Sequence, residues 1–448
     1  MSDIIAAIAT GRAPCAIGIL RLSGPGCAAL TGRVFTPKQP FADAPDRRLV
    51  LGLLHDRQGR VIDECLGVVC RAPHSYTGEE TVELQCHGSP AMLAAGLEAL
   101  LAAGARQAGP GEFTRRAFLN GKLDLTQAEA VVDLIDAETA DAAANAAGQL
   151  GGALKRAIGP VYDGLTDLCS HFHAVLDYPD EDIEDFGAAE LSGALDRAGA
   201  ALQELLATYE KGRHLRQGVR AVLLGKPNAG KSSLLNRLAG YDRVIVTDIA
   251  GTTRDTVEEP VRVGRVLLRL TDTAGIREAG DAIEALGVAR SEQAAREAEL
   301  ALFVCDASRP LTDEDRRAIE AAKCTPRSLA LCNKSDLPAA VSPDELPFDT
   351  VLTVSARTGA GLDALLEGWF LGENACDGSL LTNPRQFGAL DRASRAIKRA
   401  KTGLGLGVTP DAVLTDVEEA MAALGEVTGR TVREDITNRI FERFCVGK

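Results

Sequence analysis

Residues 225–232 read Gly-Lys-Pro-Asn-Ala-Gly-Lys-Ser, and this octapeptide restricts the possible folds more than any other part of the chain. It matches the full P-loop pattern, follows an apolar run at 219–224 and precedes a segment of helical character. In such a unit, loop amides and the helix N-terminus face phosphate groups. Lys231 is expected to reach the β- and γ-phosphates, and Ser232 to hold Mg²⁺. A fortuitous glycine-rich turn is the alternative, which the matching flanks disfavour.

Three further motifs each follow an apolar run of strand length. They are Asp272-Thr273-Ala274-Gly275, Asn333-Lys334-Ser335-Asp336 and Ser355-Ala356-Arg357. Asp272 can hold the Mg²⁺ shell, and the Gly275 amide can sense the γ-phosphate. The Asp336 carboxylate can accept two hydrogen bonds from guanine, which adenine cannot offer, and 355–357 suits a backbone contact to the guanine oxygen. Four motifs in this order predict a domain that binds and hydrolyses GTP.

Two residues refine the expected mechanism. Ile276 follows Gly275 where Ras-like GTPases carry the glutamine that orients water, so the water must be positioned otherwise. Asn228 lies within the P-loop, and its side-chain oxygen could coordinate a K⁺ ion beside the phosphates, where positive charge favours hydrolysis. A role in stabilising the turn is the alternative for Asn228.

The distribution of apolar runs and turns along the sequence predicts a multidomain chain of α+β and α/β parts. Residues 1–118 alternate short apolar runs with turns, as in an α+β domain, with a helix at 91–103. Residues 119–215 and 376–448 have helical character. Residues 216–375 alternate strands and helices, which indicates a doubly wound, mostly parallel sheet inserted into the helical domain. The spacing of Thr126 and Glu129 predicts a capping box there.

Composition narrows the function class. The formal net charge of −14 disfavours non-specific binding to nucleic acid, which depends on clustered Lys and Arg. Eleven scattered cysteines show no zinc spacing and no disulfide framework, which suits a reducing cytoplasm. Secretory signals and membrane-spanning runs are not expected. The helix carrying Arg392, Arg395, Lys398 and Arg399 could contact tRNA locally, although a solvated basic face is the commoner meaning of such a pattern.

The motifs outside the nucleotide-binding segment make the pattern more specific. They are Arg21-Leu22-Ser23-Gly24, Ser75-Tyr76-Thr77-Gly78-Glu79-Glu80, the run from Pro110 to Leu125, and Cys445-Val446-Gly447-Lys448. From end to end the chain resembles the tRNA-modification GTPases called MnmE or TrmE. Residues 247–255 look like the switch I segment of that family, and valine stands at position 446 where isoleucine is usual.

The resemblance implies a folate-binding and dimerisation domain, a helical domain and an inserted G domain. It also implies a homodimer that works with a flavoprotein, MnmG or GidA, which would carry the FAD. Together they would add a carboxymethylaminomethyl-type group to carbon 5 of the wobble uridine of certain tRNAs. A tetrahydrofolate derivative, in the 5-formyl or methylene form, would supply the one-carbon unit.

The resemblance also assigns residues. The GTP-binding set would be Asn228, Ala229, Gly230, Lys231, Ser232, Ser233, Thr247, Asp248, Ile249, Ala250, Gly251, Thr252, Thr253, Asp272, Thr273, Ala274, Gly275, Asn333, Lys334, Asp336, Ser355, Ala356 and Arg357. Ser232 and Thr253 would bind Mg²⁺, and Asn228 with the backbones of Thr247, Ile249 and Thr252 would bind K⁺. Glu284, with Lys231 and Asp272, would serve hydrolysis. Folate would contact Arg21, Glu83, Lys122 and Lys448.

Simpler interpretations stay open for several of these residues. Glu284 on residue type alone is a solvated helix charge, and the four folate residues are surface charges. Cys445 could be a reactive thiol or a small apolar residue near the chain end, and nothing local indicates reactivity. The competing functions are a ribosome-assembly GTPase, which usually carries a basic RNA-binding module, and a scaffold with a vestigial G domain, which the intact motifs disfavour.

Overall fold

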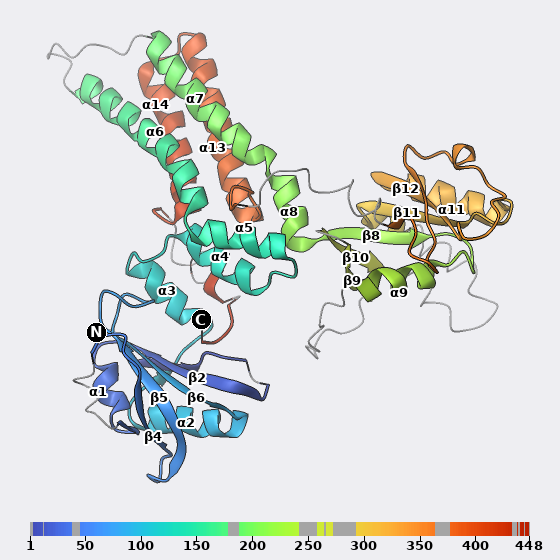
Figure 1. Ribbon diagram of the computed structural model, residues 1–448. Helices are drawn as coiled ribbons and strands as arrows, with labels where there is room; N and C mark the ends of the chain where they lie inside the picture. Colours follow the sequence, from blue (N-terminus) through green and yellow to red (C-terminus); the bar gives the residue numbers. More distant parts are fainter. Residues whose placement is uncertain are drawn as a thin grey trace. The chain divides into compact units, whose positions relative to one another are not determined.

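The computed structural model (Figure 1) describes most of the chain. The described residues are 3–11, 13–37, 45–177, 188–241, 258–263, 266–271, 293–362, 377–431, 437, 440–442 and 444–447. Contacts divide the chain into two compact units, each discontinuous in sequence. The first contains Met1–Val132, Gln149–Gly199 and Arg392–Lys448, and the second contains Asp133–Gly148 and Ala200–Asp391.

The first unit begins with a seven-stranded sheet in the order β3-β4-β5-β6-β2-β1-β7. Its strands are β1 (Ile5–Ile8), β2 (Cys15–Ser23), β3 (Phe35–Pro37), β4 (Val50–His55), β5 (Val61–Cys70), β6 (Thr81–Gly88) and β7 (Arg106–Gln107). Neighbouring strands are antiparallel, except that β7 runs parallel to β1. The expected α+β character of this part of the chain is confirmed.

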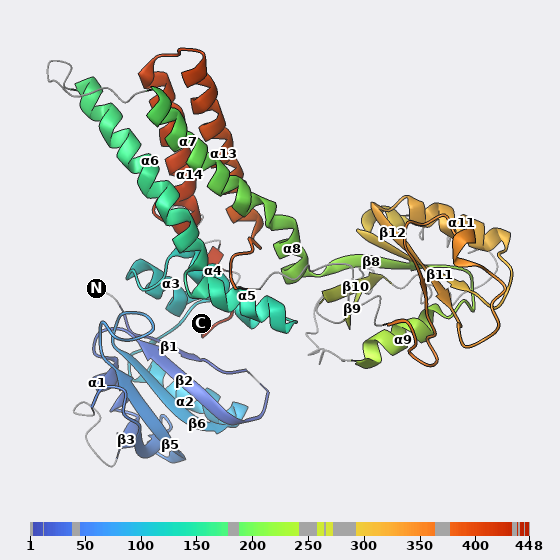
Figure 2. The same ribbon diagram turned by 45° about the horizontal axis from the view of Figure 1, so that its top comes forward.

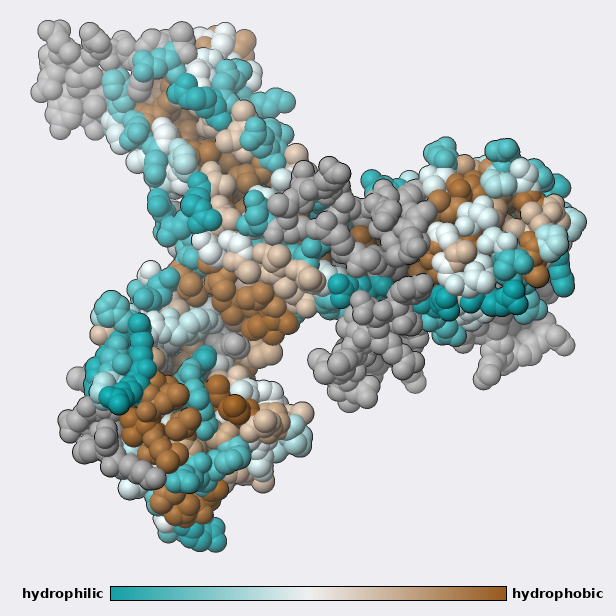
Figure 3. Space-filling view, viewed as in Figure 1, coloured by the Kyte–Doolittle hydropathy of each residue, from teal (hydrophilic) through white to brown (hydrophobic). Residues whose placement is uncertain are grey.

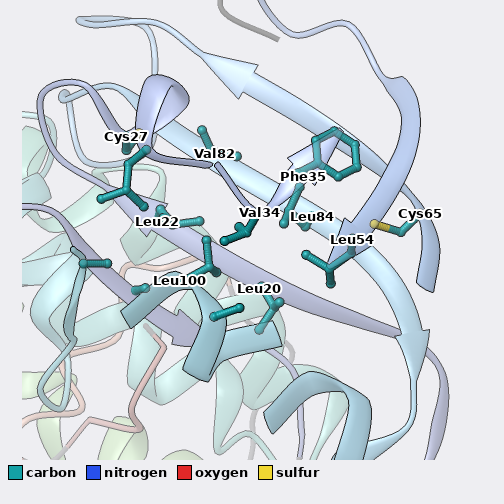
Figure 4. Close-up of a cluster of buried hydrophobic side chains, with 14 of the residues drawn as sticks. Leu20, Leu22, Cys27, Val34, Phe35, Leu54, Cys65, Val82, Leu84 and Leu100 are labelled. Atoms are coloured by element: carbon teal, nitrogen blue, oxygen red, sulfur yellow. The ribbon is translucent and has the colours of Figure 1, made fainter. Parts of the chain in front are cut away.

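The two faces of this sheet have different surroundings. One face packs against α2 (Pro90–Ala102), and its core contains Leu20, Leu22, Leu84 and Leu100, as Figure 4 shows. The short helix α1 (Cys27–Thr31) adds to the same core. The other face leaves Ile17, Leu53 and Leu66 exposed, and Figure 3 shows apolar side chains gathered over these strands.

Helices form the remainder of the first unit. They are α3 (Glu112–Leu119), most of α4 (Leu125–Ile135), α6 (Ala153–Asp177), parts of α7 (Ala188–Ala207) and α13 (Pro384–Gly405), and α14 (Pro410–Thr428). Figures 1 and 2 show α6, α7, α13 and α14 side by side. In this bundle α6 packs against α14, and the Cys169 Sγ lies 3.4 Å from the Met421 Sδ.

The end of the chain returns to the N-terminal sheet and to α3. Phe441 and Phe444 pack with Phe118, and their ring centroids lie 6.3 Å (Phe118 to Phe441) and 5.1 Å (Phe441 to Phe444) apart. Val446 forms an isolated antiparallel bridge with Pro110. The last described residues are therefore built into the first unit.

The second unit contains a six-stranded sheet in the order β13-β12-β11-β8-β10-β9. Its strands are β8 (Val219–Leu224), β9 (Glu258–Val263), β10 (Val266–Thr271), β11 (Leu300–Asp306), β12 (Arg327–Asn333) and β13 (Val351–Thr353). All pairs are parallel except the antiparallel pair of β9 and β10. The predicted mostly parallel sheet is confirmed, and the apolar run at 219–224 forms β8.

Helices cover both faces of this second sheet. Leu234 and Leu238 of α9 (Lys231–Tyr241) pack with one set of alternating strand residues. Ile319 and Ala322 of α11 (Asp313–Lys323) pack with the other set. A buried parallel sheet with helices on each face is the doubly wound architecture expected from the sequence. The unit also contains most of α5 (Ala140–Leu150), α8 (Tyr209–Gln217) and the 3-10 turn η1 (Pro343–Glu345).

Three local predictions need correction. The capping box at α4 uses Asp124 and Gln127 rather than Thr126 and Glu129, because the Asp124 carboxylate accepts from the Gln127 amide at 2.9 Å and the Gln127 side chain accepts from the Asp124 amide at 3.1 Å. Leu191, Leu195, Ala198, Leu202, Leu205, Leu206 and Tyr209 recur at three- and four-residue steps, which predicts one helix face, but the helix is divided at Thr208, where α7 ends and α8 begins. Strand β9 was not foreseen.

None of the helices in the described part of the chain is both long enough and apolar enough to cross a membrane.

Candidate nucleotide site and a second polar site

The P-loop lies at the carboxyl end of β8, where parallel strands of a doubly wound sheet leave room for a ligand. Gly225 has φ +143°, and a Cβ there would lie 2.1 Å from the Val304 carbonyl oxygen. Gly230 has φ +97°, and its Cβ would lie 2.2 Å from the Asn333 Nδ2. Both positions of the motif therefore require glycine, because the backbone approaches a neighbouring strand closely.

Lys231 is the first residue of α9 and is buried. Its ammonium donates to the carbonyl oxygens of Gly225 at 2.6 Å and Lys226 at 2.9 Å, so the charge lies inside the curve of the loop. Ser232 and Ser233 follow in the first turn of the helix and are exposed. Asn228 has φ +62°, a left-handed conformation that asparagine tolerates better than most residues, which agrees with a role in the turn.

Asn333 joins three of the predicted motifs. Its side chain is buried at the end of β12, donates to the Ala229 carbonyl at 2.9 Å and accepts from the Ala356 amide at 2.9 Å. The P-loop and the segments 333–336 and 355–357, widely separated in sequence, therefore meet at one edge of the sheet. A small buried amide with both ends satisfied fixes their spacing.

Asp336 and Lys334 are held in place from two sides. The Ser355 hydroxyl donates to Asp336 Oδ1 at 2.6 Å, and the exposed Arg357 guanidinium lies 2.6 Å from Oδ2. The hydrogen bond from Ser355, with the charge of Arg357, keeps the pKa of Asp336 below its ordinary value, so the group is an anionic acceptor near neutral pH. The Lys334 ammonium lies 2.6 Å from Asp306 Oδ2.

Two contributors to this site were missed in the sequence analysis. Asp306 ends β11 and holds Lys334, while the buried Asp315 of α11 forms a 2.7 Å ion pair with Lys226 of the P-loop. Asp306 is the last residue of the buried strand β11, and this position could have indicated that it belongs to the site. The second could not be found from local pattern, because 89 residues separate its partners.

Part of the expected site lies outside the described residues. This applies to Thr247, Asp248, Ile249, Ala250, Gly251, Thr252, Thr253, Asp272, Thr273, Ala274, Gly275, Glu284 and Lys448. The assignments of the second Mg²⁺ ligand, of the backbone K⁺ ligands and of the hydrolytic glutamate stay predictions.

A second polar group lies on the open face of the N-terminal sheet. Arg21 of β2 and Glu83 of β6 face each other across the strands and form a 2.8 Å ion pair. The Arg21 guanidinium also lies over the rings of Tyr76 and Phe113, at 5.6 and 5.7 Å from the centroids. It further donates to the Gly447 carbonyl at 3.4 Å, which brings the chain end to the same place.

Lys122 is the other predicted folate residue within the described part of the chain. Its ammonium donates to the Pro73 carbonyl at 3.2 Å, in the segment between β5 and β6 that also carries Tyr76. Cys445 is exposed, and its backbone carbonyl accepts from the Gly111 amide at 3.2 Å. Tyr76 is 39% exposed beside Arg21 and was not singled out from the sequence, although its motif was. A half-exposed aromatic ring beside a paired acid and base suits a flat heteroaromatic ligand.

The basic helix face predicted as a tRNA contact is partly neutralised. Within the first unit, Arg392 pairs with Glu426 and Arg399 pairs with Asp416 and Glu419, all on α14. These ion pairs leave less uncompensated charge for phosphate groups, so the structure does not strengthen the tRNA-contact hypothesis.

Sequence comparison covers the whole chain. Residues 4–122 match a family model described as the GTP-binding protein TrmE N-terminus, and residues 125–445 match one described as the MnmE helical domain. The chain belongs to the MnmE family. Among curated relatives named tRNA modification GTPase MnmE, the protein of Roseiflexus sp. (strain RS-1) is 45% identical over 100% of this chain and 99% of its own length. Those of Symbiobacterium thermophilum (44%; 100% and 99%) and Aquifex aeolicus (41%; 100% and 100%) are similar. This family membership agrees with the resemblance found in the sequence.

Proposed function

We propose that this chain hydrolyses GTP in the service of tRNA modification, as the names of its MnmE relatives state for those proteins. The single observation that carries the nucleotide part is the meeting of the P-loop, Asn333 and Ala356 through the Asn333 side chain. Asp336, held as an anion beside that junction, selects guanine because it can accept from both the ring NH and the exocyclic amine.

Residues of this chain have distinct roles in the proposed hydrolysis. Lys231 neutralises the β- and γ-phosphates, and the Ser232 hydroxyl with Thr253 and Asp272 holds Mg²⁺, which supplies charge that stabilises the transferred phosphoryl group. Glu284 arranges the attacking water, since Ile276 cannot. The exposed Ser232 in the first turn of α9 supports this assignment for the metal, because its hydroxyl is accessible at the mouth of the loop.

We further propose that K⁺ stimulates the reaction through Asn228 and the backbones of Thr247, Ile249 and Thr252. A cation there would place positive charge on the side of the phosphates where other GTPases use an arginine. GTP hydrolysis by the wild-type chain is expected to be faster in K⁺ than in Na⁺ at equal ionic strength. Equal rates in the two salts would reject the cation site, while leaving the GTP site unaffected.

The second site supports a folate donor. Glu83 would accept from the adjacent ring NH and amine of a pterin, and Arg21, Lys122 and Lys448 would face the anionic glutamyl tail. The Arg21–Glu83 ion pair and the ring of Tyr76 fit this chemistry, because a paired acid and base can each exchange its partner for a group of the ligand. The one-carbon unit would then reach carbon 5 of the wobble uridine as part of a carboxymethylaminomethyl-type group.

Membership of the MnmE family also suggests partners for this chain. A second copy of the chain would cover the open face of the N-terminal sheet, where Ile17, Leu53 and Leu66 are exposed. A flavoprotein of the MnmG or GidA kind would carry FAD, tRNA would be the shared substrate, and the complex would work in the cytoplasm. The proposed domains remain 1–118, 119–215, 216–375 and 376–448.

Mass spectrometry of tRNA nucleosides from cells that lack the gene tests the whole proposal. We expect the carbon-5 modification of wobble uridine to disappear, to return with the intact gene, and to stay absent with Asp336→Ala. Glu83→Gln should also fail to restore it while leaving GTP hydrolysis by the purified chain intact. Unchanged wobble uridines in the deletion strain would reject the tRNA role and favour a ribosome-assembly GTPase.

A further inference from the structure

Two cysteines and an aspartate meet at one end of the N-terminal sheet. The register of β5 and β6 pairs Leu66 with Gln85, and the next residues outward along these strands are Cys65 and Cys86. Asp63 lies two residues from Cys65 on the same strand, and side chains two apart in a strand share a face. One ligand atom from each of Asp63, Cys65 and Cys86 lies within 4.8 Å of the other two.

The surroundings of this group are closed and apolar. Both thiols are 3% exposed and belong to the core between the sheet and α2, and Figure 4 shows Cys65 at one end of that core near Leu54. Gly52 is opposite Cys65 and Gly18 is opposite Cys86. A Cβ on Gly52 would meet the side chain of Phe35, and a Cβ on Gly18 would meet that of Leu93. These two side chains therefore fill the space beside the thiols.

The carboxylate of Asp63 is oriented from outside this core. It accepts from the His87 backbone amide at 2.9 Å through Oδ2, and Oδ1 lies 2.8 Å from His87 Nδ1. The Asp63 side chain is 8% exposed, whereas the His87 ring is 80% exposed. Carboxylates that ligate metals are themselves oriented by hydrogen bonds from outer groups, and His87 supplies such bonds to Asp63.

We propose that Asp63, Cys65 and Cys86 bind a borderline-soft divalent metal ion of the zinc class. Three atoms mutually within 4.8 Å leave a point at most about 2.8 Å from each. Zinc bonds of about 2.3 Å to thiolate and about 2.0–2.2 Å to carboxylate require only a modest contraction from there. Two sulfur ligands select such a metal over Mg²⁺ or K⁺, which prefer oxygen.

Binding would be coupled to deprotonation. A cysteine binds a metal as the thiolate and gives up its thiol proton on binding. A metal must displace that proton, so its affinity rises with pH. The bound ion would join β5 to β6 at the sheet end, three residues beyond Glu83.

Titration of the reduced, chelator-treated full chain with Co²⁺ tests the site. The titration is made in excess Mg²⁺, which occupies the oxygen-ligand site of the nucleotide domain so that Co²⁺ does not bind there. We expect thiolate-to-cobalt charge-transfer absorption that saturates at one ion per chain, is displaced by Zn²⁺ and weakens as pH falls. Cys86→Ala should abolish the band, and Asp63→Asn should weaken binding about 10-fold or more, because the carboxylate ligand is lost.

The matched control is Cys305→Ala. Cys305 and Cys332 are also buried and face each other on β11 and β12, with sulfurs 3.9 Å apart, but they are not part of a three-ligand group in the described chain. The control should retain the band, and circular dichroism must show that each variant is folded. Absence of the band in the folded, reduced wild type would overturn the proposal. So would its persistence in Cys86→Ala, or a Cys65–Cys86 disulfide found by mass spectrometry of the protein as isolated.

Discussion

Each oxygen of the Asp336 carboxylate has a partner, the Ser355 hydroxyl or the Arg357 guanidinium. Arg357 is largely exposed, so its ion pair with Asp336 contributes little to stability. In the proposed binding mode, guanine takes the place of Arg357 at this oxygen. Ser355 is fully buried and keeps the carboxylate directed outward. The carboxylate that we propose selects the base is therefore oriented by a residue from the neighbouring motif.

Replacement of Asp336 by Asn should change base preference. The amide can donate to a carbonyl at position 2 of the base, so xanthosine triphosphate becomes the better ligand and GTP affinity falls. Loss of two hydrogen bonds to a charged group, at about 1.5–3 kcal/mol each, predicts at least 100-fold weaker GTP binding. Competition between the two nucleotides in a fluorescence binding assay measures this, and an unchanged preference for GTP would contradict the role of Asp336.

A charge network ties the N-terminus of the first unit to α3. The hydrogen bond from Arg106 lowers the pKa of Asp3 to about 2. Burial would raise the pKa of Glu112, but hydrogen bonds from Arg106 and others hold it below its ordinary value. Carboxylates with depressed pKa values stabilise the folded state above their unfolded pKa near 4, and this contribution disappears as pH falls toward the folded value.

Arg106→Ala should therefore lower the free energy of unfolding at pH 7 by about 1 kcal/mol, since these groups are partly exposed. The difference from wild type should shrink as pH falls from about 4 to about 2. Urea unfolding at several pH values measures it. Arg33→Ala is the control, because Arg33 donates to the Ala103 carbonyl, and its effect should not follow this pH course. A difference for Arg106→Ala that is constant with pH would show that the ion pairs do not contribute.

At the scale of elements, α11 is connected to the P-loop through its own N-terminal cap. Asp315 accepts from the Thr312 amide at 2.8 Å in a capping box and also pairs with Lys226. The Lys226 carbonyl in turn accepts from Lys231. One buried carboxylate thus connects the start of α11 with the P-loop residue whose carbonyl accepts from Lys231.

Asp315→Ala should leave the Lys226 ammonium without its buried partner. Breaking a buried pair on one side costs about 3–5 kcal/mol, and a lost cap adds about 1 kcal/mol. Denaturant unfolding should show this loss, and GTP affinity should fall because the loop is less fixed. Glu314→Ala changes the exposed neighbour in the same turn and should lower neither the stability nor the GTP affinity. Equal stability of the two variants would contradict the connection.

Helices and strands were easiest to predict from the sequence where their hydrophobic periodicity was clear. The apolar run 219–224 is buried at five of its six positions, so its strand was evident. Strand β9 (Glu258–Val263) carries glutamates and a proline at the sheet edge, and edge strands lack such a period. The cap of α4 was misplaced because Thr126 and Asp124 both suit an N-cap, and only the hydrogen bonds decide between them.

The site was predictable as far as motifs extend. Lys231, Asn333 and Asp336 belong to contiguous sequence patterns, and the structure brings these patterns together at one edge of the sheet. The partners Asp306 and Asp315 were not predictable, because strand order and helix packing bring them to the site from other elements. The Arg21–Glu83 pair needed the register of β2 against β6, which the sequence does not specify.

At the scale of the molecule, the open face of the N-terminal sheet should determine association of two copies. Leu66→Glu would place a charge among Ile17, Leu53 and neighbouring apolar side chains, and a buried unpaired charge opposes an interface. Light scattering should show a shift from dimer to monomer. Leu337→Glu alters an exposed leucine of the second unit and should leave the mass unchanged. A dimeric Leu66→Glu protein would exclude this face.

The pairing of α6 with α14 and of Pro110 with Val446 also governs how the chain can be made. A ribosome adds about 5–20 residues per second, so α6 must wait on the order of 10–50 seconds between its own completion and the emergence of its partner. During that interval the face of α6 that contacts α14 lacks its native partner. The helical bundle is therefore completed only after the whole nucleotide domain has been translated.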